Sequence, residues 1–236
     1  MGRRHRHLNR IQCGAVMDYD ARFIQGLSNG AQPTGWDNRS GSLNLTRTGT
    51  AADLTYNTNA QGGQPCMRFN GTAALLRYSS YNPTTVGYSN QATVIAGCLS
   101  TKATSTQRLL YRWRQSATNV MQIWAQFSDN LMYFDHGRES APGRISAAAS
   151  TTTAATLISA MAGPSTGNIK RNGVQIASGT MSASVASIAT NFDLGGFTGA
   201  EHWVGDFFAF IHAPLASEPV RRRIEQSVAF SFKLAI

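Results

Sequence analysis

Apolar and polar residues alternate through much of the chain with the two-residue period of a β-strand. The alternation predicts strands over residues 108–114, 120–127 and 131–135, with a turn at 128–130 joining the last two into a hairpin. One face is expected to carry Leu109, Tyr111, Trp113, Met121, Ile123, Ala125 and Phe127, and the other Arg108, Leu110, Arg112, Arg114, Gln122, Trp124 and Gln126. Residues 92–99 form a continuous apolar run, which is typical of a strand buried on both faces.

A turn signal and a low-complexity segment mark the next part of the chain. The sequence Arg-Asn-Gly-Val at 171–174 favours a type I′ hairpin turn between two strands within residues 168–176. Residues 146–155 consist mostly of Ala, Ser and Thr, and we expect a loop there that leads into a strand over 155–162.

The C-terminal segment combines one more strand with a helix. In residues 206–212 apolar side chains occupy both faces, with Phe208 and Phe210 expected on one face and Phe207, Ala209 and Ile211 on the other. Ser217 can cap a helix that has Pro219 in its first turn. Val220, Ile224 and Val228 recur at helical spacing, so this helix should lie on a sheet. Arg221, Arg222 and Arg223 are expected on its solvent side.

Three groups of residues resemble motifs of concanavalin A-like (laminin-G-like) domains, and they occur in the family's order. They are residues 21–41 with Trp36, Asp37, Ser40 and Gly41; residues 67–72 (MRFNGT); and the closing run with Gly195-Gly196, Val204-Gly205-Asp206, Leu215-Ala216-Ser217, Arg223-Ile224-Glu225 and Lys233. The Asn-Gly-Val hairpin also matches this family. The resemblance implies an all-β, two-sheet antiparallel jelly-roll β-sandwich with one short C-terminal helix, in which Trp36 and Trp203 are structural.

Length and charge divide the chain into an arm and one domain. A sandwich of about 200–250 residues is common, so residues 18–236 are expected to form a single domain. Of the net charge of +9, four charges come from Arg3, Arg4, Arg6 and Arg10 in residues 1–17, which leaves five on the rest. This arm could remain solvated or become ordered against a partner subunit. Contact with nucleic acid is less favoured, because no nucleic-acid motif follows the arm.

The residues give little support for catalysis or for a bound metal. The family includes glucanases with paired carboxylates on one strand, but the four glutamates, Glu139, Glu201, Glu218 and Glu225, form no such run. Asp18 and Asp20 have the spacing without a third carboxylate, and Asp135-His136 lacks a nucleophile elbow. We therefore predict a non-enzymatic protein without a cofactor. Calcium stays an alternative, with Asp37, Asp129 and Asp135 as candidate ligands.

The three cysteines, Cys13, Cys66 and Cys98, form no metal pattern, and Cys98 is expected to be a buried free thiol.

A sugar-binding face is the best candidate for chemistry. Sugar sites in such sandwiches combine an aromatic ring with amides or charged groups. Trp124, Gln122 and Gln126 should point from one strand face, with Arg112 and Arg114 beside them if the two strands are neighbours. The alternative for Trp124 is a ring covered by a loop or packed against another subunit.

Two functions remain open at this level. One is a structural component of a larger assembly, such as a phage virion decoration, fibre or tail protein with possible glycan adhesion. The other is a free-standing lectin-like module. The N-terminal segment lacks the hydrophobic core of a secretory signal, and no apolar run reaches the roughly 20 residues that span a membrane. These features favour the assembly interpretation, with the protein located in a virion or other extracellular particle.

Overall fold

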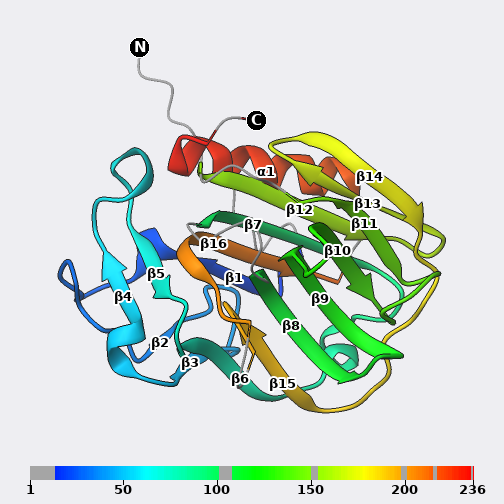
Figure 1. Ribbon diagram of the computed structural model, residues 1–236, viewed down its shortest axis with the longest axis horizontal. Coiled ribbons are helices and arrows are strands. Elements are labelled where there is room, and N and C mark those ends of the chain that lie inside the picture. The colour runs from blue at the N-terminus through cyan, green and yellow to red at the C-terminus, as the bar shows by residue number, and fades with distance from the viewer. Residues whose placement is uncertain (1–13, 101–107, 150–153, 198–200, 215–216, 235) are drawn as a thin grey trace.

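The computed structural model describes residues 14–100, 108–149, 154–197, 201–214, 217–234 and 236. Within these residues the chain forms two antiparallel sheets of eight strands, and one α-helix follows them (Figure 1). The sheets pack face to face, which confirms the predicted all-β sandwich with a C-terminal helix. The predicted arm lies mostly in residues 1–13, outside those described.

The first sheet, sheet A, has the order β14-β13-β12-β7-β16-β5-β4, and β1 also pairs with β16. Its strands are β1 (Met17–Asp20), β4 (Leu54–Asn57), β5 (Cys66–Asn70), β7 (Ala92–Ser100), β12 (Thr156–Ala162), β13 (Thr166–Arg171), β14 (Val174–Thr180) and β16 (Val204–Ala213). The predicted buried run is β7, which lies in the middle of this sheet beside β16. The predicted hairpin turn joins β13 to β14, with Asn172 and Gly173 both at positive φ as a type I′ turn requires.

The second sheet, sheet B, has the order β11-β10-β9-β8-β15-β6-β3-β2. Its strands are β2 (Gly35–Trp36), β3 (Leu45–Thr48), β6 (Leu75–Tyr81), β8 (Arg108–Ser116), β9 (Asn119–Gln126), β10 (Leu131–His136), β11 (Arg144–Ala148) and β15 (Thr190–Leu194). Four short 3-10 turns, η2 (Ala21–Phe23), η3 (Ala51–Asp53), η4 (Gln61–Gly63) and η5 (Pro83–Val86), connect strands of the two sheets. The loop expected at 146–155 is wrong in its first part, because Ser146–Ala148 extend β11 and pair with β10.

The core between the sheets is rich in aromatic rings. Phe192 of β15 and Phe210 of β16 have ring centroids 5.9 Å apart, and Tyr111 of β8 lies within 6 Å of both. The predicted alternation of β9 is confirmed for Met121, Ile123 and Ala125, which lie in this core. It is wrong for Phe127, which follows β9 and packs against Trp124 and Tyr133. The outward residues of β9 are therefore left for the other face of sheet B.

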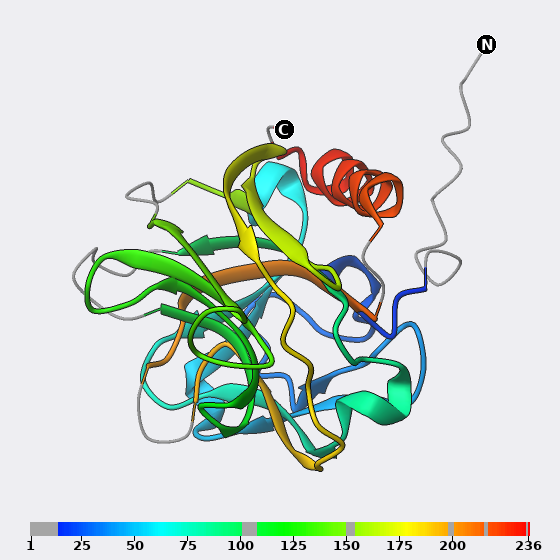
Figure 2. The ribbon, with the colours of Figure 1, turned by 90° about the vertical axis from the view of Figure 1, so that its right-hand side faces the viewer.

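The helix α1 (Glu218–Phe232) covers the outer face of sheet A (Figure 2). Its buried residues Ile224, Val228 and Phe232 share a second hydrophobic cluster with Ile95, Leu157, Phe208 and Ile211 of the sheet. Together these contacts confirm that the helix lies on a sheet. The outer face of sheet A is thus closed, and the outer face of sheet B lies on the opposite side of the sandwich.

A bulge in β16 changes which of its phenylalanines share a face. Phe207 pairs with Cys98, but Ala209 pairs with the adjacent Gly97, so one extra residue is inserted. As a result Phe207 and Phe210 lie in the core between the sheets, while Phe208 packs beneath α1. The predicted grouping of Phe208 with Phe210 is wrong for this reason.

Bulges also shift the phase of β8. The register is interrupted between Leu109 and Tyr111, and both Leu110 and Tyr111 lie in the core. The predicted grouping of Leu110 with Arg112 is therefore wrong. From Tyr111 onward the alternation is regular, with Trp113 inward and Arg112 on the opposite face.

The three arginines of α1 do not all face solvent. Arg222 and Arg223 are exposed as predicted, but Arg221 is fully buried. Arg221 donates hydrogen bonds to Asn168 of β13 and to Glu218, and its Nε lies 3.6 Å from Glu225. The prediction for Arg221 is wrong because α1 packs so closely on sheet A that a second row of its side chains is enclosed.

Candidate functional site

Six consecutive strands of sheet B place one polar residue each at matching register on the outer face. We call this set the polar row: it consists of Arg77, Asp193, Arg112, Gln122, Asp135 and Arg144, from β6, β15, β8, β9, β10 and β11. The neighbours of these residues along the strands, among them Trp113, Met121 and Phe134, point into the core. Because side chains alternate across a sheet, the polar row faces away from the core.

Three guanidinium groups on this face each bind one carboxylate through two hydrogen bonds. Arg77 binds Asp193 at 2.6 and 2.8 Å, and Arg144 binds Asp135 at the same two distances. Arg114, two residues beyond Arg112, binds Glu139 of the β10–β11 connection at 2.8 and 3.2 Å. Bidentate pairs of this kind fix both partners in orientation as well as in charge.

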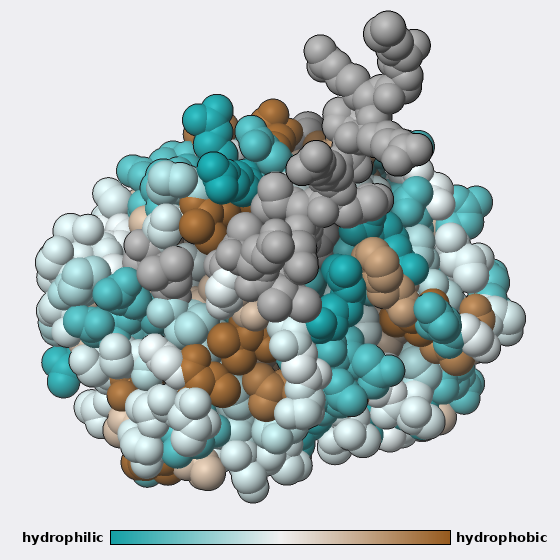
Figure 3. Space-filling model, turned by 180° about the vertical axis from the view of Figure 1, so that it is seen from behind, coloured by the Kyte–Doolittle hydropathy of each residue, from teal (hydrophilic) through white to brown (hydrophobic). Residues whose placement is uncertain are grey.

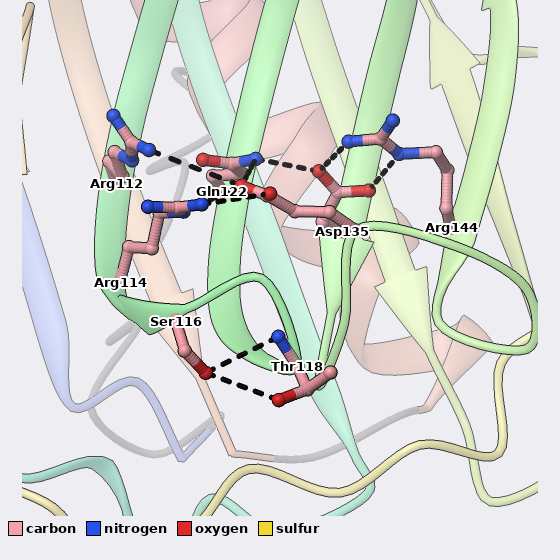
Figure 4. Close-up of polar contacts among 8 residues, drawn as sticks. Arg112, Arg114, Ser116, Thr118, Gln122, Asp135 and Arg144 are labelled. Carbon is pink, nitrogen blue, oxygen red and sulfur yellow. Dashed lines mark hydrogen bonds and ion pairs between the residues drawn. The ribbon is translucent and has the colours of Figure 1, made fainter.

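Gln122 lies at the centre of the polar row (Figure 4). Its Nε2 donates to Asp135 at 2.7 Å and to Glu139 at 3.0 Å, so both protons of the amide are used. Its Oε1 is buried and has no hydrogen-bond partner among the described residues. An acceptor that is buried without a partner costs free energy, so this position calls for a donor that the described residues do not supply.

Arg112, next to Gln122 in register, is the guanidinium with the weakest ion pair. Its closest carboxylate oxygen, on Glu139, is 4.0 Å away, and its Nε is buried without a hydrogen-bond partner in the described residues. The ring of Phe197 lies 4.3 Å from the guanidinium carbon. Burial, followed by the nearby charge of Arg114, lowers the pKa of Arg112. The guanidinium stays charged but is poorly compensated.

The two carboxylates beside Gln122 differ in their environment. Burial raises the pKa of Asp135, against the opposing effect of Arg144. For Glu139 burial is the largest single influence and acts in the same upward direction, but the hydrogen bonds from Arg114 and Gln122 and the charges of Arg114 and Arg112 together lower the pKa. Both groups are engaged by guanidinium nitrogens on one side and by Gln122 on the other.

The structure brings together three of the five residues predicted for sugar binding. Gln122, Arg112 and Arg114 meet on the outer face of sheet B, as the pairing of β8 with β9 requires. Trp124 is only 4% exposed, and its ring packs edge-on against Phe127 at 5.0 Å. Gln126 is also buried, where it accepts from Arg108 and donates to Asn130. Trp124 therefore offers no free ring face in this arrangement.

Reasoning from the sequence missed six residues of the site: Arg77, Asp193, Arg144, Glu139, Tyr133 and Phe197. Arg144 and Glu139 are fixed by the β10–β11 hairpin, and the alternation of Tyr133 and Asp135 along β10 was the one signal that could have placed them near Gln122. The ring of Tyr133 lies 4.3 Å from the guanidinium carbon of Arg144. Phe197 follows the Gly195-Gly196 turn, and no sequence pattern predicted that its ring would lie beside Arg112.

The carboxylates considered for calcium or catalysis lie apart from each other. Asp135 and Asp129 both belong to the β9–β11 region, but Asp135 is buried beside Arg144 and Asp129 is exposed and accepts from Tyr133. Asp18 pairs with Arg39 at 3.2 Å and Asp20 with Arg22 at 2.6 Å. In the part of the chain that the structure describes, no three His, Cys, Asp or Glu side chains gather as a metal site would require.

A groove lies at the opposite edge of sheet B from β11. It has a volume of about 560 Å³ and runs beside η2, β2 and β3, and its lining includes Phe23, Trp36, Asp37 and Arg39. Phe23 is 47% exposed, and the guanidinium of Arg39 covers its ring at 3.7 Å. Apolar side chains on the face shown in Figure 3 gather in small separate groups among polar ones. The Nε1 of Trp36 in its lining is a buried donor without a partner in the described residues, but no buried unpartnered acceptor lies beside it in the lining, so we treat the groove as secondary.

Neither cysteine in the described residues takes part in a site. Cys66 and Cys98 are buried free thiols, as expected for Cys98, and burial raises the pKa of Cys98 to about 12. Cys13 lies outside the described residues.

No helix in the described ranges has the length and apolar character needed to cross a membrane.

Comparison with known proteins finds neither a matching family model nor a matching curated protein. Solved structures do match. Domain 4 of AbnA, an extracellular arabinanase from Geobacillus stearothermophilus in complex with arabinotriose, is 16% identical, with a TM-score of 0.63 over 89% of this chain and 97% of that one. The binding domain of botulinum neurotoxin DC, in complex with rat synaptotagmin II, is 9% identical, with a TM-score of 0.64 over 94% of this chain.

A third match is the sialidase of Trypanosoma rangeli, which is 12% identical, with a TM-score of 0.61 over 92% of this chain. The chain spans about a third of the sialidase (33%) and about half of the neurotoxin domain (52%). At these identities the likeness shows a shared β-sandwich fold.

Proposed function

We propose that this protein is a non-catalytic carbohydrate-binding β-sandwich that holds its ligand on the polar row of sheet B. One observation carries the proposal. Arg112 presents an Nε–H donor and Gln122 an Oε1 acceptor at adjacent positions of the sheet, and both atoms are buried without partners in the described residues. A sugar hydroxyl, which accepts and donates at once, would satisfy both atoms.

Two aromatic rings support this assignment. Phe197 is 37% exposed beside Arg112, and Tyr133 is partly exposed beside Arg144. Each ring has a guanidinium against it, and Tyr133 also packs edge-on against Phe127 at 5.8 Å. In the proposal, the exposed part of each ring contacts the sugar. Because Arg112 of β8 and Arg144 of β11 are three strand spacings apart, about 14 Å of sheet separates the two arginines beside which the rings lie. A short oligosaccharide lying across β8 to β11 would reach both rings.

The ion pairs and protonation of Asp135 and Glu139 argue against catalysis. Asp135 and Glu139 both accept from Gln122, which brings them close enough to suggest the acid and nucleophile of a retaining glycosidase. A general acid must carry a proton and then release it, and the lowered pKa of Glu139 disfavours that role. Burial raises the pKa of Asp135, but both of its oxygens accept hydrogen bonds from Arg144, so protonation would disrupt a bidentate ion pair. The arabinanase domain, crystallised with arabinotriose, offers a precedent for this fold holding a sugar.

The test is a glycan array probed with the wild-type protein and with two variants of equal charge. Arg112→Gln removes the donor at the site, and Arg223→Gln removes an exposed arginine of α1 on the opposite side of the sandwich. We expect the wild type and Arg223→Gln to bind the same glycans, and Arg112→Gln to lose at least tenfold in affinity. A repeat with a chelator tests the calcium alternative. Binding that Arg112→Gln leaves intact would contradict the assignment of the site.

The assembly function remains a second candidate because of the clustered charge at Arg3, Arg4, Arg6 and Arg10. In this proposal the arm contacts another subunit of a particle such as a virion, and the sandwich displays the sugar site outward. The native protein would then sediment with large particles, and deletion of residues 1–13 would release it without affecting glycan binding. A native protein found as a free monomer would argue for the free-standing lectin-like module. Binding to nucleic acid would instead fall steeply with salt and require the arm.

A further inference from the structure

Among Arg77, Arg112, Arg114 and Arg144 on the outer face of sheet B, only Arg112 has no bidentate carboxylate partner in the described residues. Arg77, Arg114 and Arg144 each have their own carboxylate in bidentate contact, at 2.6 to 3.2 Å. Arg112 lies between these pairs. Its closest carboxylate oxygen is 4.0 Å away on Glu139, which Arg114 already binds at 2.8 Å. The neighbouring Asp193 is held by Arg77. One guanidinium is therefore left over in the middle of the row.

The surroundings of Arg112 make the missing counter-charge more significant. Its side chain is only 11% exposed, so water compensates the charge incompletely. Phe197 covers one face of the guanidinium plane, and the charge of Arg114 repels it from the side. Glu201 and Asp193 attract it, but neither comes within the 4.0 Å of an ion pair in the described residues. Ring stacking leaves the edge of the plane, where the N–H groups point, for a ligand.

We propose that the site selects saccharides that carry a carboxylate, with the sugar acid bound by Arg112 and a neighbouring hydroxyl donating to Oε1 of Gln122. This inference rests on the proposed function and specifies its ligand class. A planar carboxylate matches the fork of a guanidinium, and charge-assisted hydrogen bonds are about twice as strong as neutral ones. A neutral sugar would satisfy the donor and acceptor but would leave the surplus charge uncompensated.

The experiment compares each acidic sugar with its own neutral form. The panel consists of oligosaccharides of galacturonate, glucuronate, mannuronate and guluronate and a sialic acid-terminated glycan, each paired with its carboxyl-reduced derivative. Affinities are measured for the wild type, Arg112→Gln, Arg112→Lys and the control Arg223→Gln, after thermal unfolding has shown which variants are folded. Arg112→Lys keeps the charge and so provides a second reading if Arg112→Gln fails to fold.

We expect the wild type and Arg223→Gln to bind at least one acidic member about tenfold more tightly than its reduced form. Arg112→Gln should bind both forms of that pair equally, and Arg112→Lys should keep a reduced preference, because lysine lacks the bidentate fork.

Two results would overturn the acid selectivity while leaving the carbohydrate function standing. One is equal binding of both forms by the wild type with a loss in Arg112→Gln. The other is an acid preference that persists in Arg112→Gln, which would show that the overall charge of +9 attracts acidic sugars without this site. If no saccharide of either kind binds, both proposals fail.

Discussion

At the scale of single residues, two buried histidines stand out besides the polar row. His212 of β16 is fully buried, its ring centroid lies 4.4 Å from that of Tyr88, and neither of its nitrogens has a hydrogen-bond partner among the described residues. His136 of β10 is 1% exposed and contacts the carbonyl of Ser89 through Nε2. Burial lowers the pKa of His136 to about 4 and that of His212 well below its usual value, and the two charges would also repel.

These histidines predict a loss of stability in mild acid. Their folded-state pKa values lie below the unfolded value of about 6.5, so the unfolded chain binds more protons as the pH falls. The stability of the folded state that depends on these neutral histidines is fully present above about pH 6.5 and is lost as the pH falls from 6.5 towards about 4. Denaturant unfolding at pH 7 and pH 5, above the range where most carboxylates titrate, should show a decrease of about 2 kcal/mol for each histidine.

The variant His212→Phe supplies the control for this prediction. It removes one titrating group without removing a hydrogen bond that the described residues make, so the decrease between pH 7 and pH 5 should fall to about half. A free energy of unfolding that does not change between these two pH values in the wild type would show that the histidines are hydrated or already charged in the folded protein.

At the scale of elements, α1 is held on sheet A by polar contacts as well as by its apolar face. Arg221 donates to Asn168 of β13, and Glu225 accepts from Ser159 of β12. Glu218 accepts from Lys170 of β13. Side-chain hydrogen bonds therefore attach the helix to β12 and β13, in addition to the packing of Ile224 and Val228.

Replacing Arg221 by Ala should destabilise the protein by about 3–5 kcal/mol, because it leaves the buried Glu225 without its guanidinium neighbour. The matched control is Arg223→Ala in the same helix, which removes an exposed arginine and should change stability by less than about 0.5 kcal/mol. Chemical denaturation followed by circular dichroism measures both. Equal effects of the two substitutions would mean that Arg221 is not enclosed as described.

At the scale of the whole molecule, the two outer faces of the sandwich differ in the residues that they present. The outer face of sheet A is closed by α1, and the outer face of sheet B carries the polar row. Hydrogen–deuterium exchange with a bound saccharide should therefore slow in β8 to β11 and around Phe197, and remain unchanged in α1. Protection centred instead on η2 and β2 would move the ligand to the groove beside Phe23.

The sequence predicted the local elements well where the pattern was regular. Alternation in β9 identified its inward and outward residues, and Asn172-Gly173 identified a hairpin turn. It failed at the bulges of β8 and β16, because one inserted residue inverts every later position and leaves no mark in composition. It also failed at Arg221, since a charged side chain becomes buried only when partners from distant strands are present to receive it.

Local sequence patterns left β1, β3, β4, β6, β11 and β15 unpredicted. They identified β7 to β10, β12 to β14 and β16, the last helix in outline, and the residue types that could meet a sugar. These properties follow from side-chain periodicity and turn chemistry, which act over a few residues. Only the tertiary structure decided that Arg77 and Asp193 would pair across 116 positions, and that Arg112 would be left between such pairs beside Gln122. The order and register of strands far apart in the chain set that arrangement, because they depend on how the whole core packs.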